Sequence, residues 1–346
     1  MFDVVTIGSI TRDNFLESDF NLIPWPRVSS GKAIVFPVGE KMSVRRVYST
    51  IGGNSANASI TLSRQGFRVA CFGKIGNDIS GREIREKLQS EKVKPLLGIS
   101  KNVPTAYSVL LLQKGERTIL GYHGASDTLT IKDVPWRQLK SKWWYLSLAG
   151  ESDSLLKPLL KFSKKHGIRV AFNPSGHHIH HRRKDILDSL KHLSFLVLNA
   201  DEASELVGIS FRKPKEVFKR LDKLTPGIVA VTDGPRGVLV SDGKYIYKAG
   251  IYKEKAIVDR TGAGDSFGSG FVAGLMAKGL KSKVKKSLPT GRQGKFSPED
   301  VKYAIRLASA NATSVVEHVG ATEGTLKKND FAAVRWQRLT ISVSAL

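Results

Sequence analysis

Gly262, Ala263, Gly264 and Asp265 follow one another in the chain and combine a flexible turn with an acid. The residues after them, 266–271, are small or apolar with helical spacing, so we expect a helix to begin at this turn. The first N–H groups of a helix lack partners within it, and together with the helix dipole they attract phosphate. Bound phosphate would repel a carboxylate placed there, so the acid needs a chemical role. We predict that Asp265 takes the proton from an alcohol that attacks phosphorus.

An ordinary helix start, with glycine for the bend and aspartate as a first-turn acid, is the alternative explanation. The string DRTGAGD at residues 259–265, however, closely resembles the second signature of the ribokinase-like, or PfkB, family of carbohydrate and nucleoside kinases. In that family the Gly-Ala-Gly turn is the anion hole and the next aspartate is the catalytic base. The resemblance therefore assigns the anion hole to Gly262, Ala263 and Gly264, and the base to Asp265.

A second stretch, GGNSANAS, begins at Gly52 and resembles the first signature of the same family. Paired glycines let a backbone lie flat against a substrate ring, and the Asn57 amide offers both a donor and an acceptor to a vicinal diol. Read alone, the stretch is equally well a helix start capped by Asn54 or Ser55. Together with the downstream signature, it implies that Gly52, Gly53 and Asn57 bind the acceptor.

Asp13 lies just beyond an expected first strand that ends at Gly8. In the family an aspartate here accepts hydrogen bonds from sugar hydroxyls, so the resemblance implies that Asp13 binds the acceptor. An Asx-type turn is the alternative. A further family-like stretch, residues 75–81, contains Asp78, which we expect to cap a helix rather than to contact substrate.

Asn199 and Glu202 follow an expected strand at 195–198 and resemble the family's N-x-x-E motif. The motif implies that Asn199 meets a phosphate oxygen and that Glu202 holds Mg²⁺ through water. A capping box explains the same spacing, and the two interpretations are compatible. Phosphoryl transfer from ATP requires such a divalent ion. The resemblance implies further nucleotide-binding roles for Thr232, Gly234, Gly237 and Asn311.

Asp259 and Thr261 match positions that in many family members help to hold a monovalent cation, commonly potassium. Arg260, between them, stands where the family often has a small or hydroxyl residue. The run HHIHH at 177–181 invites a transition-metal interpretation. We instead expect a solvated loop, because no spaced acid or cysteine accompanies the histidines and the next residues, RRK, would repel a cation.

The composition is that of an ordinary soluble protein, with 346 residues, 41% hydrophobic and 25% charged. No stretch approaches the roughly 20 apolar residues of a membrane helix, and no secretory leader is recognisable. The single cysteine, Cys71, suits a reducing cytosol, so we expect a cytoplasmic protein. The net charge of +24 is spread along the chain, so we expect a solvated basic surface that attracts nucleotides rather than a nucleic-acid partner.

Strand-like and helical runs alternate along the chain, which predicts an α/β fold with a mostly parallel sheet between helices. The resemblance implies the ribokinase-like three-layer α/β/α sandwich over residues 1–325. It also implies a small β lid within about 14–50 and 104–123, which in the family often forms a homodimer contact. A β-rich run is expected at 255–258 and a tight turn at 114–116. Residues 278–296 read as a basic exposed insertion, and 326–346 as a tail of uncertain order.

These features predict ATP-dependent phosphorylation of a sugar hydroxyl, with ATP, Mg²⁺ and in some members K⁺. A nucleoside kinase of the same fold is the alternative, because Trp25, Phe36 and Tyr48 could stack a base. A phosphorylated sugar is also open as acceptor, because the expected lid carries arginines that could hold its phosphate: Arg45, Arg46 and Arg117.

Overall fold

The computed structural model describes residues 1–28, 30–113, 116–148, 150–279 and 296–346. Most of the insertion predicted at 278–296 and part of the turn predicted at 114–116 therefore lie outside the described residues. No helix within the described ranges is long and apolar enough to cross a membrane.

The centre of the molecule is a ten-stranded sheet whose first seven neighbouring strands are parallel. In spatial order these are β7 (Val93–Ser100), β6 (Val69–Gly76), β1 (Phe2–Gly8), β10 (Ser141–Ser147), β11 (Arg169–Phe172), β12 (Phe195–Asn199) and β13 (Ile228–Thr232). An antiparallel extension follows, formed by β14 (Val238–Ser241), β15 (Tyr245–Ala249) and β16 (Ile341–Ala345). The carboxyl ends of the parallel strands meet at one edge, where ligands bind in such sheets.

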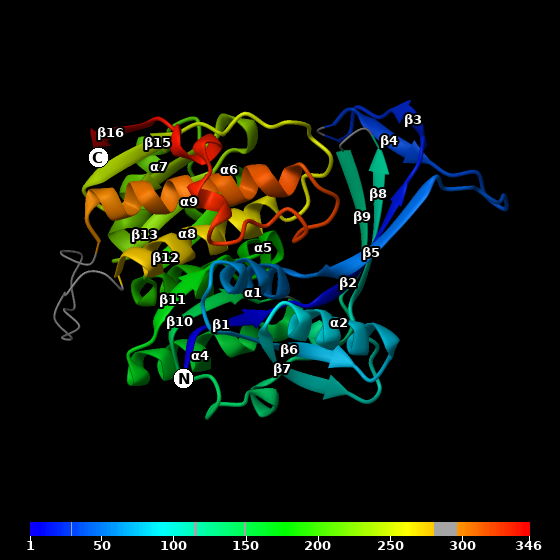
Figure 1. The fold of residues 1–346 in the computed structure, drawn as a ribbon, viewed down its shortest axis with the longest axis horizontal. Coiled ribbons are helices and arrows are strands. Elements are labelled where there is room, and N and C mark those ends of the chain that lie inside the picture. The colour runs from blue at the N-terminus through cyan, green and yellow to red at the C-terminus, as the bar shows by residue number, and fades with distance from the viewer. Residues whose placement is uncertain (29, 114–115, 149, 280–295) are drawn as a thin grey trace.

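Helices cover both faces of this sheet, which confirms the predicted three-layer architecture (Figure 1). Successive strand residues such as Val4 and Val5 enter separate cores, because neighbouring side chains of a strand point to opposite faces. One core is closed by α1 (Asn54–Arg64), α2 (Ile79–Ser90), α8 (Ala263–Gly279) and α9 (Pro298–Val316). The other is closed by α4 (Leu156–His166), α5 (Gly176–Ser189), α6 (Ala200–Val207) and α7 (Pro214–Leu224). The short helix α3 (Gly124–Asp127) precedes β10 in the chain.

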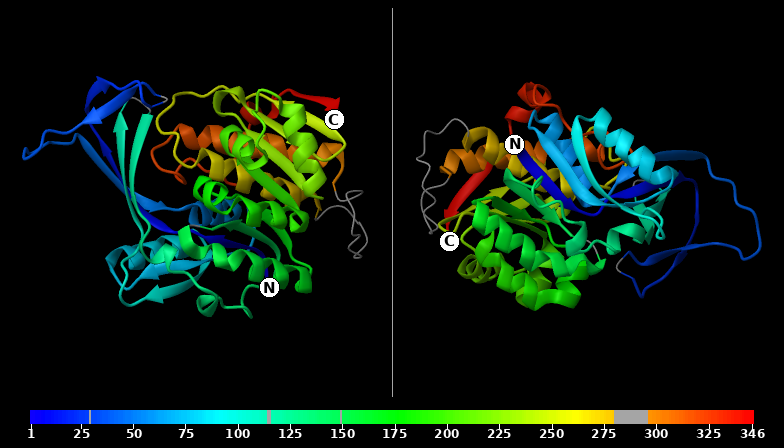
Figure 2. Two further views of the ribbon diagram at one scale, coloured as in Figure 1. Left: turned by 180° about the vertical axis from the view of Figure 1, so that it is seen from behind. Right: turned by 90° about the horizontal axis from the view of Figure 1, so that it is seen from below.

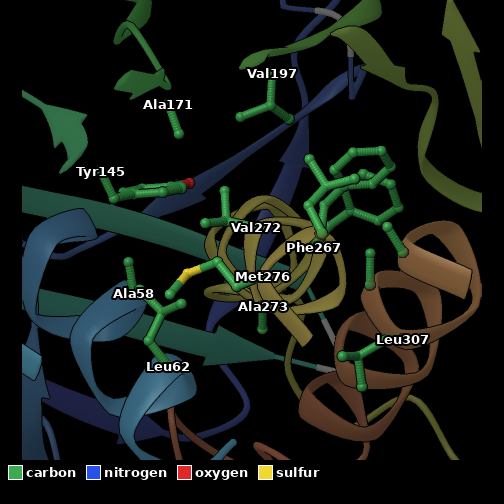
Figure 3. Close-up of a cluster of buried hydrophobic side chains, with 14 of the residues drawn as sticks. Ala58, Leu62, Tyr145, Ala171, Val197, Phe267, Val272, Ala273, Met276 and Leu307 are labelled. Carbon is green, nitrogen blue, oxygen red and sulfur yellow. The ribbon is translucent and has the colours of Figure 1, made fainter. Parts of the chain in front are cut away.

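Helix α8 is buried between the sheet, α1 and α9, and this fixes the position of its first turn (Figure 3). A Cβ atom at Gly274 would come within 2.5 Å of the Ala304 Cα atom, so the glycine allows α8 and α9 to pack closely. Side chains such as Phe271 and Leu275 are fully buried, and each stabilises the fold by about 1.5–3 kcal/mol.

A smaller sheet projects from one side of the body as a lid (Figures 1 and 2). Its strand order is β5-β2-β8-β9, with β2 (Thr11–Glu17), β5 (Arg46–Gly52), β8 (Tyr107–Gln113) and β9 (Glu116–Tyr122). A separate hairpin of β3 (Asn21–Pro24) and β4 (Lys32–Val35) extends from it.

Two local predictions were wrong. Residues 255–258 form no strand, because this exposed segment pairs with no strand among the described residues. It is hydrogen-bonded to the end of α9 instead, where Val258 N–H donates to the Val316 carbonyl at 2.8 Å. The histidine run is helical rather than a loop, since Ser175 Oγ accepts from His178 N–H at 3.3 Å and starts α5. At the other end of the chain, Ile341–Ala345 pairs with β15 as strand β16.

Candidate active site

Asp265 lies in the first turn of α8, and its carboxylate Oδ2 accepts a hydrogen bond of 2.9 Å from the Asn57 amide nitrogen. Asn57 is in the first turn of α1, which packs against α8. The Asn57 side chain is buried, and its Oδ1 atom has no hydrogen-bond partner within the described residues. The two helices therefore present a carboxylate and an unused amide acceptor side by side.

The backbone before Asp265 forms the predicted turn. Gly262 has φ of +77°, and a Cβ there would lie 2.4 Å from the Ala321 Cβ, so no larger residue fits. Gly264, by contrast, has no atom within 4 Å of where its Cβ would lie, so that side of the turn is open. In the described part of the chain the N–H groups of Gly264 and Asp265 have no acceptor, which leaves two donors at the helix N-terminus.

Asp13 is the second acid of the site, and it lies within β2 rather than in an Asx turn. Its buried carboxylate accepts from Thr11 Oγ1 at 2.6 Å. A Cβ at Gly52 would lie 1.9 Å from Asp13 Oδ2, so the carboxylate rests directly on this glycine. The next residue, Gly53, has φ of +88° and passes close to the chain at Ile10. The paired glycines thus bring the start of α1 against Asp13.

The strand register of the lid defines the surface that carries Asp13. Directly paired residues share a face, so Asp13 lies in one row with Thr50, Ser108 and Gly121. Two residues further along, the same face carries an apolar row of Tyr48, Phe15, Leu110 and Ile119. The third row is partly charged, with Arg46, Glu17, Leu112 and Arg117. The middle row packs against Val319 of the main domain, so this face is the inner surface of the lid.

The electrostatics of the site favour a proton acceptor. Burial raises the pKa of Asp265 to about 6; the charge of Asp13 adds to this rise, and the Asn57 hydrogen bond and Arg117 oppose it. Burial also raises the pKa of Asp13, with the charge of Asp259 acting in the same direction. Arg117 is exposed and forms no ion pair within the described residues, so its influence on Asp265 is that of an uncompensated lid cation.

Asn199 and Glu202 form a reciprocal capping box at the start of α6. Asn199 N–H donates to Glu202 Oε2 at 2.8 Å, and Glu202 N–H donates to Asn199 Oδ1 at 2.8 Å. Neither Glu202 Oε1 nor the Asn199 side-chain nitrogen forms a hydrogen bond within the described chain, so both can bind other ligands. Burial raises the pKa of Glu202, and the negative charge of Asp265 contributes. A cation between these acids would relieve their repulsion, so the donor set fits a hard divalent ion.

The segment after β13 lies next to Asn199, because Thr232 is its partner in the sheet. Gly234 and Gly237 both have positive φ, of 51° and 91°. A Cβ at Gly237 would lie 2.2 Å from the Ala249 carbonyl oxygen, so the close approach of the backbone at Ala249 requires a glycine at position 237. Arg236 forms an ion pair with Asp233 at 2.7 Å, so the charge of its guanidinium group is compensated.

Three residues that were predicted to bind a ligand form hydrogen bonds within the protein instead: Asn311, Asp259 and Thr261. Asn311 is fully buried; its amide nitrogen donates to the Leu307 carbonyl at 3.0 Å and its Oδ1 accepts from Leu326 N–H at 3.1 Å. The structure therefore does not bring Asn311 to an open surface. Asp259 accepts from Thr261 Oγ1 at 2.6 Å and from Gly320 N–H at 3.0 Å. These bonds hold the segment before Ala321 against the anion-hole turn.

Sequence reasoning missed Ser108 and Tyr145. Ser108 bonds to the Asp13 carboxylate across the parallel β2–β8 pair, a contact between distant segments that no local motif signals. The Tyr145 hydroxyl is buried under α8 without a partner among the described residues, and a Cβ at Gly268 would lie 2.4 Å from it. In Figure 3 this hydroxyl points toward the apolar cluster around Val272. The run of glycines in α8 was its only sequence signal.

Comparison with known proteins finds similarity over most of the chain. The model of the pfkB family carbohydrate kinases matches residues 26–329. An ATP-dependent 6-phosphofructokinase of Thermoanaerobacterium thermosaccharolyticum is 27% identical, covering 84% of this chain and 85% of that protein. A nucleoside kinase of Methanothermobacter thermautotrophicus is 26% identical, covering 80% and 82%. The solved structure of ribokinase from Giardia lamblia has a TM-score of 0.78 at 20% identity, covering 96% and 97%, and shares the fold.

Proposed function

Since the chain belongs to the pfkB family of carbohydrate kinases, we propose that it transfers the γ-phosphoryl group of ATP to a hydroxyl group of a sugar. The observation that carries this proposal is the setting of Asp265. A carboxylate with a pKa raised to about 6 lies beside two N–H donors at a helix N-terminus that have no acceptor among the described residues. A base and an anion site in one turn is the arrangement that phosphoryl transfer to an alcohol requires.

Asp265 acts as the base in this proposal. Its Oδ2 atom is held by Asn57, which leaves Oδ1 to take the proton from the attacking hydroxyl. Asp13 accepts hydrogen bonds from the acceptor's other hydroxyls, and the Asn57 Oδ1 atom, buried without a partner in the described chain, accepts another. These contacts fix the reacting oxygen relative to the base, and such positioning is a large part of the catalytic effect.

The anion hole of Gly262, Ala263 and Gly264 holds the transferred group. The N–H groups of Gly264 and Asp265 donate to the charge that develops on its oxygens. Asn199 and Glu202 would hold Mg²⁺, and Thr232 with Gly234 lies beside them to border the nucleotide. When bound, Mg²⁺ supplies positive charge that offsets the charge of the phosphates.

The lid supports a second candidate, a sugar phosphate as acceptor. Of the three arginines named above as candidates to hold a phosphate, Arg45 pairs with Asp19 and Arg46 lies 3.9 Å from Glu17. Arg117 has no such partner among the described residues and acts on Asp265. A free cation on the inner surface of the lid suits an acceptor with an anionic group. The nucleoside alternative has weaker support, since Phe36 packs on Phe20 and Arg27 lies over Trp25.

We further propose that the protein forms a homodimer through the outer face of the lid. Val47, Leu120 and Tyr122 lie on the face opposite Asp13 and are 59%, 57% and 51% exposed. Leu120 and Tyr122 adjoin each other on β9, whereas Val47 lies on β5 at the other edge of the sheet. Neighbouring exposed apolar side chains such as those of Leu120 and Tyr122 are typical of a surface that another molecule covers.

The deciding experiment measures ADP release from ATP and Mg²⁺ with a panel of sugars, sugar phosphates and nucleosides, with and without K⁺. Turnover on one acceptor class that disappears in Asp265→Asn, while ATP still binds, supports the proposal. Full turnover in that variant would contradict the role of Asp265 as the base. ATP binding without turnover on any acceptor class would contradict the proposed activity.

A further inference from the structure

The histidine run forms part of helix α5, and this places His177 and His181 one helical turn apart. Both side chains are exposed, and their ring centres lie 4.4 Å apart. Residues four apart in a helix lie on the same face. We propose that His177 and His181 together bind a divalent transition-metal ion, of the class Cu²⁺, Ni²⁺ or Zn²⁺, on the surface of α5.

The separation of the rings agrees with this geometry. Metal–imidazole nitrogen bonds are about 2.0–2.1 Å long, so two rings at adjacent coordination positions of one ion have centres roughly 4.5–5 Å apart. The observed 4.4 Å needs no movement of the helix backbone. The backbone of α5 departs from helical geometry at Arg182, after both histidines, and the buried Ile179 between them holds the first part of the helix against the core.

Two of the three cationic residues that follow the pair have partners in the fold. Arg182 lies 3.3 Å from Asp185, and Arg183 donates to the Leu206 carbonyl at 2.8 Å. The nearby His180 bonds to Glu205 of α6 at 3.0 Å. The repulsion expected from a basic sequence is therefore smaller in the folded protein than along the chain.

The site has two protein ligands and leaves the other positions to water. His178 is buried and its Nε2 atom lies 3.1 Å from the Gly150 carbonyl oxygen, so it faces the interior. The described residues contain no group of three or more histidine, cysteine, aspartate or glutamate side chains able to hold a metal. Binding should accordingly be weaker than at a structural zinc site, where four ligands close the coordination shell.

The chemistry of the ligands separates this site from the proposed Mg²⁺ site at Glu202. Imidazole suits copper, nickel and zinc, whereas Mg²⁺ takes oxygen ligands. Mg²⁺ should therefore not compete for the histidine pair. The inference is independent of the kinase reaction, because it concerns a surface without any of the proposed catalytic residues.

The test is calorimetric titration of the full-length, tag-free protein with Ni²⁺ at neutral pH. We expect one site, at least tenfold weaker binding in each of His177→Ala and His181→Ala, and unchanged binding in excess Mg²⁺. His166→Ala is the matched control, because that ring packs on Phe162 at the end of α4.

Circular dichroism should show that the exposed substitutions leave the fold intact. Unchanged Ni²⁺ affinity in both His177→Ala and His181→Ala would overturn the proposal. An equal loss in His166→Ala, or displacement of Ni²⁺ by Mg²⁺, would overturn it as well.

Discussion

The Asn57 amide nitrogen lies 2.9 Å from Asp265 Oδ2, although 208 positions separate the two residues in the chain. The contact joins the first turn of α1 to the first turn of α8. It gives the proposed base a fixed orientation and lowers its pKa against the effect of burial. In the proposed mechanism, this one hydrogen bond would link a ligand of the acceptor to the protonation state of the base.

The pH dependence of turnover should report this bond. A base works when ionised, and the pKa of Asp265 is raised to about 6, so kcat/KM should rise as the pH passes 6. Asn57→Ala removes a contact that favours the carboxylate, so the acidic limb should move to higher pH and kcat/KM at pH 7 should fall at least tenfold. Asn54→Ala is the control, since Asn54 bonds to Ser147 instead. If the acidic limb of the pH profile lies at the same pH in the unsubstituted protein, Asn57→Ala and Asn54→Ala, this role of Asn57 is contradicted.

Removal of the Asp265 charge should stabilise the protein. The folded-state pKa of Asp265 exceeds the ordinary value of 3.8, so the native state holds the proton more tightly and loses stability as the pH rises from about 4 to 6. Asp265→Asn should therefore raise the free energy of unfolding by about 1–2 kcal/mol at pH 7.5. The gain should vanish near pH 4, as urea denaturation can show. An equal gain in the free energy of unfolding at pH 4 and at pH 7.5 would contradict this explanation, because the charge of Asp265 is lost near pH 4.

Two glycines of the anion hole should respond differently to alanine. Gly262→Ala combines a positive φ with a clash against Ala321, so we expect a loss of about 2 kcal/mol or more of stability together with activity. Gly264→Ala meets no atom and should fold normally, while its methyl group obstructs the phosphate and lowers kcat. Thermal unfolding and ADP release measured on both variants separate the two effects. A fully active Gly264→Ala would place the phosphate elsewhere.

Arg117→Gln tests the charge of the lid. If the acceptor carries a phosphate, its KM should rise at least tenfold, because a charge-assisted hydrogen bond is lost. The KM of an unphosphorylated sugar should change little. Arg46→Gln is the matched control, since Arg46 lies in the same row of the lid near Glu17. Equal effects of the two substitutions would indicate general charge rather than a specific contact.

Leu120→Lys tests the proposed dimer. A charge on the exposed outer face of the lid should weaken association at least tenfold in sedimentation experiments, without loss of folding. Ile79→Lys on α2 is the control, because Ile79 is 66% exposed but lies outside the lid. If the unsubstituted protein sediments as a monomer, the proposed dimer is contradicted directly.

Much of the main fold could be predicted from local patterns. As predicted, β1 ends at Gly8, β12 covers 195–198 and α8 begins in the turn before Asp265, because apolar periodicity and capping residues act within a few positions. The capping of α2 by Asp78 was predicted for the same reason and is confirmed by its 2.8 Å bond to Gly81 N–H. The strand predicted at 255–258 is wrong because its β-forming residues have no neighbouring strand within the described ranges.

By itself, the sequence determined which residues we propose to carry the chemistry: the turn before Asp265 and the paired glycines at 52 and 53 are recognisable because their spacing is local. Tertiary structure alone decided their partners. The bond between Asn57 and Asp265, the row that joins Asp13 to Ser108, and the free charge of Arg117 depend on which distant strands and helices meet. Such contacts follow from strand register and helix packing, which are set by burial of the whole core and not by any short segment.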